Sequence, residues 1–203
     1  MSTQTLSDKI LSRIYGKKRG WVFTPVHFRD LGNDLGIRKA LQSIRDRGVI
    51  CRLARGVYVY PKMHPRLGLL SPSPDQIARA LAGKDDLRIQ PSGAYAANLL
   101  RLSEQVPAKV VFLTDGANRK IKVGNQEIIL KRTTPKNMAT AGRTSGLVIQ
   151  ALRYLGKDHV DDAIVDALAR RLSADDRRQL IKDIRHAPAW IGANFRRLAK
   201  RND

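Results

Sequence analysis

Two short runs of β-branched and aromatic residues, Val49–Leu53 and Val57–Tyr60, flank a segment that ends in Gly56. This pattern predicts a β-hairpin in which the glycine takes the left-handed backbone conformation of the turn. Just before the hairpin, four apolar residues share one narrow arc of a helical wheel: Ile37, Ala40, Leu41 and Ile44. Gly48 then acts as a stop signal. An amphipathic helix that leads directly into a tight hairpin restricts this part of the chain to a few folds.

Two further helices are expected earlier in the chain. Leu6–Tyr15 has apolar residues at helical spacing, with Ser7 as the expected N-cap. A short helix then starts at Pro25, where the missing N–H costs nothing, and Thr24 is its expected cap. The order helix, helix, helix, hairpin is that of a winged helix-turn-helix. Residues 1–62 are therefore predicted to form a winged helix-turn-helix DNA-binding domain.

The composition changes after the hairpin. Four prolines fall within the next residues: Pro61, Pro65, Pro72 and Pro74. Because proline removes an N–H donor and fixes φ, this density predicts no regular element. Residues 63–74 are predicted to be a Pro-rich linker and residues 75–203 a C-terminal domain. The predicted fold class is α+β, in which the winged helix-turn-helix is followed by a mixed α/β domain with an antiparallel hairpin and a helical tail.

Within the C-terminal domain, the sequence predicts helices, a buried strand and a second hairpin. The hairpin pairs Arg119–Val123 with Gln126–Arg132 across Gly124 and Asn125. The strand is expected in the short apolar run "KVVFLTDG", residues 109–116. The helices are expected at residues 75–81, 92–100, 135–155, 160–172 and 174–185, with a final short helix after residue 187. Ser173 and Asp176 form the expected capping box of the fifth of these helices.

Charge is the strongest compositional signal, because 38 Lys and Arg against 18 Asp and Glu give a formal net charge of +20. Such a field attracts polyanions, of which nucleic acid is the commonest in a cytoplasm. No stretch approaches the roughly 18 consecutive apolar residues of a membrane span. The single cysteine, Cys51, allows no intrachain disulfide. We therefore expect a cytoplasmic protein that binds nucleic acid and has no membrane partner.

The helix before the first hairpin carries polar residues opposite its apolar stripe, and these predict a major-groove reader. Arg38, Lys39 and Gln42 have donor geometries that match guanine and adenine edges, and Arg45 is expected to meet phosphate. Basic residues of the adjoining turn and loop extend this footprint, and the Thr24 hydroxyl is expected to add a phosphate contact. The predicted DNA-contacting residues are Lys17, Lys18, Arg19, Thr24, Arg38, Lys39, Gln42, Arg45, Arg52 and Arg55.

The second hairpin is also basic, and its function stays open at this point. A possible second basic surface consists of Arg119, Lys120, Lys122, Lys131 and Arg132. These cations fit a surface that touches nucleic acid or another anionic partner. They fit equally well the solvent-exposed face of an antiparallel sheet whose other face packs on the core.

Catalytic constellations are absent from the sequence. The four histidines lack the spacing of metal ligands, and no Walker loop, GxGxxG motif or nucleophile elbow occurs. The acidic residues Asp158, Asp161, Asp162 and Asp166 suggest a metal-dependent nuclease at first sight, but acids are also favoured in the first turn of a helix. We expect no enzyme activity, no cofactor and no metal.

The segments "LARGVYVYP", "QVPAKVVFLTDG" and "RKIKVGNQEIILKR" resemble the AbiEi-type antitoxins of bacterial abortive-infection and type IV toxin–antitoxin systems, over roughly residues 5–155. The resemblance implies a winged-helix domain that binds inverted repeats in its own promoter and represses the antitoxin–toxin operon. It also implies a C-terminal domain that counters a nucleotidyltransferase-like toxin without forming a stable complex with it. The resemblance places such a chain in phage defence. An inverted-repeat operator needs two copies of the chain, and these are expected either to meet on the DNA as monomers or to bind as a dimer.

A second interpretation is an RNA-binding or RNA-protecting basic protein. Tyr58 and Tyr60 on the hairpin are its expected stacking platforms, although aromatic residues make up only 5% of the chain.

Overall fold

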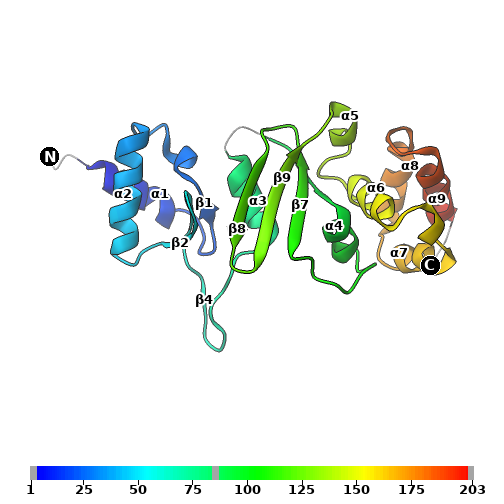
Figure 1. Cartoon of the computed structure of the whole chain (residues 1–203), viewed down its shortest axis with the longest axis horizontal. Coiled ribbons are helices and arrows are strands. Elements are labelled where there is room, and N and C mark those ends of the chain that lie inside the picture. Colours follow the sequence, from blue (N-terminus) through cyan, green and yellow to red (C-terminus); the bar gives the residue numbers. More distant parts are fainter. Residues whose placement is uncertain (1–3, 84–86, 201–203) are drawn as a thin grey trace. The chain divides into compact units, whose positions relative to one another are not determined.

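The computed structural model describes residues 4–83 and 87–200 and shows a mixed α+β protein (Figure 1). Its contacts divide the chain into two compact units. Unit 1 runs up to Leu87 and includes Ile121–Gly124, and unit 2 holds Arg88–Lys120 and the chain from Asn125 onward. The division therefore lies later in the chain than the expected linker at residues 63–74, which belongs to unit 1.

The helices of unit 1 start at polar caps. Helix α1 spans Leu6–Tyr15 as predicted, but its N-cap is Thr5, which forms a capping box with Asp8, and not Ser7. The short second helix is the 3₁₀ helix η1, Pro25–Phe28, rather than a longer α-helix. Helix α2, Asp34–Asp46, follows it.

A sheet with the strand order β1-β3-β2 completes this part of unit 1. Strands β2, Cys51–Ala54, and β3, Val57–Val59, form the predicted hairpin. Strand β1, Val22–Phe23, pairs antiparallel with β3 and was not predicted. The sheet and helices enclose a core whose fully buried members include Ile10, Ile14, Phe23, Phe28, Ile37, Leu41 and Ile44.

The Pro-rich segment is not devoid of regular structure, so that prediction was wrong. Strands β4, Met63–His64, and β5, Gly68–Leu69, pair antiparallel in a short ribbon. Pro65 lies in the turn between them, where a missing N–H breaks no strand pairing. Helix α3, Pro74–Ala82, then packs against β1.

A four-stranded sheet has the order β6-β7-β9-β8. Unit 2 holds β6, β7, β9 and the first residues of β8, whereas Ile121–Val123 of β8 are grouped with unit 1. Strands β8, Arg119–Val123, and β9, Gln126–Arg132, have the predicted bounds. Strand β7, Lys109–Thr114, lies within the apolar run that predicted it and ends before Asp115 and Gly116. Strand β6, Ile89–Ser92, is an additional edge strand that pairs antiparallel with β7. β7 and β9 run parallel to each other, so the sheet is mixed.

The helices of unit 2 pack beside this sheet and beside one another. Helix α4, Gly93–Leu99, contacts β7, and helix α6, Thr144–Leu155, contacts α4 and β6. The single helix predicted over residues 135–155 is interrupted, because helix α5, Pro135–Met138, is short and Gly142 adopts a φ of +79° before α6 begins. The remaining helical segments are η2 (Lys157–His159), α7 (Asp162–Ala169), α8 (Ala174–Lys182), η3 (Ile184–His186) and α9 (Ala189–Lys200).

Candidate nucleic-acid interface

Helix α2 is held by one apolar stripe and by its cap. The side chains of Ile37, Leu41 and Ile44 are fully buried in the core of unit 1. Asn33 caps the helix, because its side-chain oxygen accepts a hydrogen bond of 2.7 Å from the N–H of Gly36. The opposite face of α2 is therefore fixed toward solvent.

The exposed face of α2 carries three of the predicted DNA-contacting residues. Arg38, Lys39 and Gln42 are all exposed, and within the part of the chain that the structure describes their side chains have no hydrogen-bonded or ion-paired partner. Leu35, with 64% of its surface exposed, lies in the same arc of the helix. Sequence reasoning missed Leu35, although an apolar residue outside the buried stripe was visible in the sequence. Donors beside an exposed apolar group suit base edges and thymine methyl groups.

Arg45 differs from these three residues. It is half-buried, and its guanidinium forms hydrogen bonds of 3.0 and 2.7 Å with the carboxylate of Asp46. A phosphate contact by Arg45 would have to compete with this ion pair.

The turn between β2 and β3 presents two more of the predicted cations. Arg52 on β2 and Arg55 in the turn itself are exposed, and Gly56 adopts a φ of +73°, as the sequence indicated. The Nε of Arg52 donates a hydrogen bond of 3.3 Å to the carbonyl oxygen of Ala54, which fixes the side chain along the turn. The strand register shifts between Arg52 and Ala54.

Lys17, Lys18 and Arg19 line a hollow of about 510 Å³ in unit 1. Arg79 of α3 and Trp21 also line it, and no acidic residue does. The guanidinium of Arg19 lies 4.9 Å from the centre of the Tyr60 ring and donates a hydrogen bond to the carbonyl oxygen of Pro61. Sequence reasoning missed Arg79, which reaches the hollow because α3 packs on β1.

Thr24 does not present its hydroxyl to solvent as expected. Only 5% of its surface is exposed, and the hydroxyl oxygen lies 3.2 Å from Nδ1 of His27. Its N–H donates a hydrogen bond of 3.2 Å to the same nitrogen. Thr24 therefore starts η1 as predicted but is not part of the exposed basic surface.

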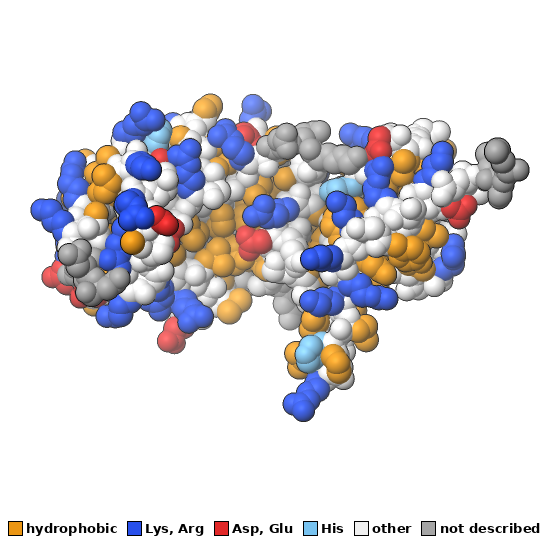
Figure 2. All heavy atoms as spheres, turned by 180° about the vertical axis from the view of Figure 1, so that it is seen from behind, with side chains coloured by type: hydrophobic (Ala, Val, Ile, Leu, Met, Phe, Trp, Pro, Cys, Tyr) orange, Lys and Arg blue, Asp and Glu red, His pale blue; other side chains and the backbone are white. Residues whose placement is uncertain are grey.

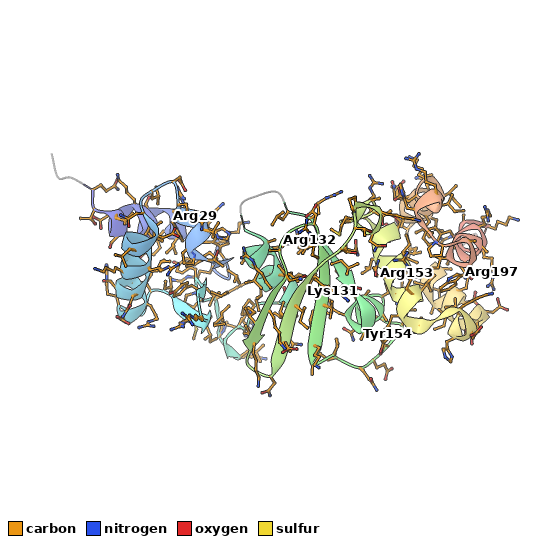
Figure 3. All side chains as sticks on the ribbon, turned by 45° about the horizontal axis from the view of Figure 1, so that its top comes forward. Arg29, Lys131, Arg132, Arg153, Tyr154 and Arg197 are labelled. Carbon is orange, nitrogen blue, oxygen red and sulfur yellow. The ribbon has the colours of Figure 1, made fainter. Side chains whose placement is uncertain are left out.

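The cations of the β8–β9 hairpin are exposed but divided between its faces. On β8, Arg119 lies on one face and Lys120 and Lys122 on the other. Lys131 and Arg132 are adjacent at the end of β9 (Figure 3). The Nζ of Lys120 lies 2.7 Å from a carboxylate oxygen of Glu127. The five residues thus do not form one continuous face. On the face that Figure 2 shows, Lys and Arg side chains are scattered rather than gathered in one patch.

Unit 2 also contains a buried polar network, centred on Asp183. The carboxylate of Asp183 accepts hydrogen bonds from the hydroxyl of Ser145 at 2.5 Å and from Arg143 at 2.6 Å, and only 4% of its side chain is exposed. Burial alone would raise the pKa of Asp183, but hydrogen bonds from Ser145 and Gln179, followed by the guanidinium charge, hold that pKa below its usual range. The network ties the first turn of α6 to the end of α8.

Two of the acidic residues considered for a nuclease, Asp161 and Asp162, have structural partners. Asp161 caps α7 by accepting a hydrogen bond of 2.9 Å from the N–H of Ile164, and Asp162 pairs with Arg197. Among residues 4–83 and 87–200, no group of three or more His, Cys, Asp or Glu side chains could hold a metal ion. Over the same residues, no helix combines the length and the apolar character required to cross a membrane.

A protein-family model matches most of the chain. The model of a family of unknown function (DUF6088) matches residues 9–180, a range that includes α2, the β2–β3 turn and the β8–β9 hairpin. No curated protein matches the chain.

Proposed function

The chain belongs to the DUF6088 family, and we propose that it is a DNA-binding antitoxin and transcriptional autorepressor whose unit 1 is a winged helix-turn-helix. The observation that carries the DNA-binding part is the exposed face of α2. There, Arg38, Lys39 and Gln42 stand without partners among the described residues, beside the exposed Leu35. Because these side-chain donors have no partner among the described residues, they can form hydrogen bonds with base edges without first breaking an ion pair.

The order of elements in unit 1 supports the same proposal. α1, β1, η1 and α2 precede a hairpin, and the sheet order β1-β3-β2 places that hairpin in one sheet with β1. In a winged helix-turn-helix, α2 is the recognition helix and the β2–β3 turn is the wing. Arg52 and Arg55 then contact the backbone beside the groove that α2 enters.

The antitoxin and autorepressor roles extend this proposal through the resemblance to AbiEi-type antitoxins. In this proposal the operator is an inverted repeat in the protein's own promoter, bound by monomers or by a dimer. Unit 2 counters a nucleotidyltransferase-like toxin without forming a stable complex with it.

The RNA-binding alternative has less support. The ring of Tyr58 packs at 6.0 Å against Phe23, and the ring of Tyr60 lies between Tyr15 and Arg19, at 5.9 and 4.9 Å. Both rings already have neighbours that a stacked base would displace.

The test is a salt titration of fluorescence anisotropy with three labelled probes of equal length, namely the DNA upstream of the protein's own coding sequence, a random duplex and a structured RNA. The proposal expects the upstream duplex to bind at least about 1000-fold more tightly than the random duplex. If six to eight phosphates are contacted, log K should fall with log salt at a slope of about −5 to −7. Equal affinity for all three probes would contradict the proposal, and tighter binding to the structured RNA would favour the RNA-binding function.

A further inference from the structure

The β4–β5 ribbon projects from the rest of unit 1 (Figure 1). Met63, Leu67 and Leu69 have 63%, 72% and 52% of their surfaces exposed. Met63 and Leu69 are directly opposite each other across the ribbon, so their side chains share one face. A cluster of large apolar side chains on so short a ribbon is what an interaction site provides, whereas singly scattered ones need no explanation.

The charge of the ribbon indicates the kind of partner. Residues 61–74 contain Lys62 and Arg66 but no Asp or Glu. Figure 2 shows hydrophobic side chains along the projecting ribbon and a basic side chain at its end. A second copy of this chain would bring a net charge of +20 toward another +20, so self-association through the ribbon is electrostatically opposed. A partner that complements both the basic charge and the exposed apolar side chains of the ribbon must be negatively charged outside and apolar inside, as the phosphates and stacked bases of a duplex are.

The tip of the ribbon is rigidly shaped. Nδ1 of His64 accepts hydrogen bonds from the N–H groups of Arg66 and Leu67, at 3.2 and 3.3 Å. Gly68, with a φ of +68°, closes the turn, and the N–H of Leu70 donates to the carbonyl oxygen of Lys62 at 2.9 Å. Because these contacts fix the tip before it binds, little conformational entropy is lost when it meets a partner.

We propose that the β4–β5 ribbon enters the minor groove of double-stranded DNA and wedges Leu67 between base pairs. Leucine, methionine and proline are side chains that unstack base steps in this way, and the resulting kink bends the duplex toward the major groove. Lys62 and Arg66 contact the phosphates on the two sides of the groove. This inference rests on the proposed function, since the ribbon and α2 belong to the same unit and would meet one duplex.

The experiment uses the full chain and upstream duplexes that each carry one 2-aminopurine, together with an end-labelled duplex for energy transfer. The wild-type protein should raise 2-aminopurine fluorescence at one or two adjacent positions and bend the duplex by about 20–90°. Leu67→Ala should abolish both signals while the preference for upstream over random duplex is retained. Val106→Ala is the matched control, because Val106 of unit 2 is equally exposed at 73% and should leave both signals unchanged.

The outcomes separate the two proposals. A wild-type protein that prefers upstream DNA but leaves it straight and stacked, or a Leu67→Ala protein that still kinks it, would overturn the wedge and leave the repressor function standing. Absence of any duplex preference would overturn both. Two other results would assign the ribbon to a different partner, provided that the DNA stays unbent. One is binding to vesicles that contain phosphatidylserine, and the other is dimerisation without DNA, if the Leu67→Ala protein loses that property.

Discussion

The charged side chains of α2 and those around Asp183 show two different uses of charge in one chain. On α2, Arg38 and Lys39 are exposed and have no partner among the residues that the structure describes. In unit 2, Asp183 is almost fully buried and accepts hydrogen bonds from Ser145, Arg143 and Gln179. A buried charge depends on its partners, because removal of one partner destabilises the fold, whereas an exposed charge without a partner is available to a ligand. The local arrangement, and not the net charge, therefore separates structural from binding residues.

The largest effect on stability is expected from Asp183→Ala. Loss of the carboxylate leaves the buried hydroxyl of Ser145 without its acceptor and removes the ion pair with Arg143, which should lower the free energy of unfolding by about 2–4 kcal/mol. Urea unfolding followed by the fluorescence of Trp190, in a Trp21→Phe background, measures this unit by itself. Asp175→Ala is the control, because its carboxylate is 85% exposed and pairs only at the surface with Arg178. Equal effects of the two variants would contradict the account.

A somewhat smaller loss is expected from Gly146→Ala. A Cβ at this position would lie 2.3 Å from the backbone oxygen of Thr140 and 2.6 Å from Oε1 of Gln90. Overpacking of this kind costs about 1–3 kcal/mol. Thermal unfolding should show it, and Gly16→Ala should be nearly neutral because its Cβ would meet its nearest neighbour only at 3.4 Å.

Acid should weaken unit 2 through the same network. Because the pKa of Asp183 is lowered in the folded state, its contribution to stability is complete above the unfolded pKa, near pH 4, and is lost as the pH falls through the lower folded value. The slope for one such proton is at most about 1.4 kcal/mol per pH unit. Unfolding midpoints measured below pH 5 should fall less steeply in Asp183→Asn than in the wild type. Parallel curves would show that this carboxyl does not carry the acid sensitivity.

The smallest stability effect is expected on α2. Arg38→Ala with Gln42→Ala removes side chains that have no partner among the described residues, so the free energy of unfolding of unit 1 should change by less than about 0.5 kcal/mol. Trp21 fluorescence in a Trp190→Phe background reports on this unit. A clear destabilisation would mean that these residues serve the fold after all.

Elements with strong local signals were predictable from the sequence. The helix at Leu6–Tyr15 and the strands on either side of Gly124 and Asn125 have their predicted bounds, because apolar periodicity and turn residues act locally. Strand β1 and the β4–β5 ribbon were missed, since strands of two residues have no periodicity. Strand β6 was also missed, because Pro91 argues against a strand. The proline is tolerated because β6 lies at the edge of the sheet.

The candidate site was predictable to the same extent. The exposed residues of α2 follow from its buried stripe, so Arg38, Lys39 and Gln42 were found by position alone. Burial of the Thr24 hydroxyl beside His27 depends on the packing of η1, and the position of Arg79 depends on α3 folding back onto β1. Neither contact produces a periodic pattern in the sequence, so neither could be predicted from it.

The most direct test of the central claim compares two double variants for their preference between upstream and random duplex, measured by fluorescence anisotropy at one salt concentration. Arg38→Ala with Gln42→Ala should reduce that preference at least about 30-fold, since each lost base contact is worth about 1–3 kcal/mol. Arg119→Ala with Gln126→Ala removes the same two side-chain types from the β8–β9 hairpin and should change affinity for both duplexes equally. An unchanged preference in the α2 variant, or a larger loss in the hairpin variant, would contradict the assignment of α2 as the helix that reads DNA.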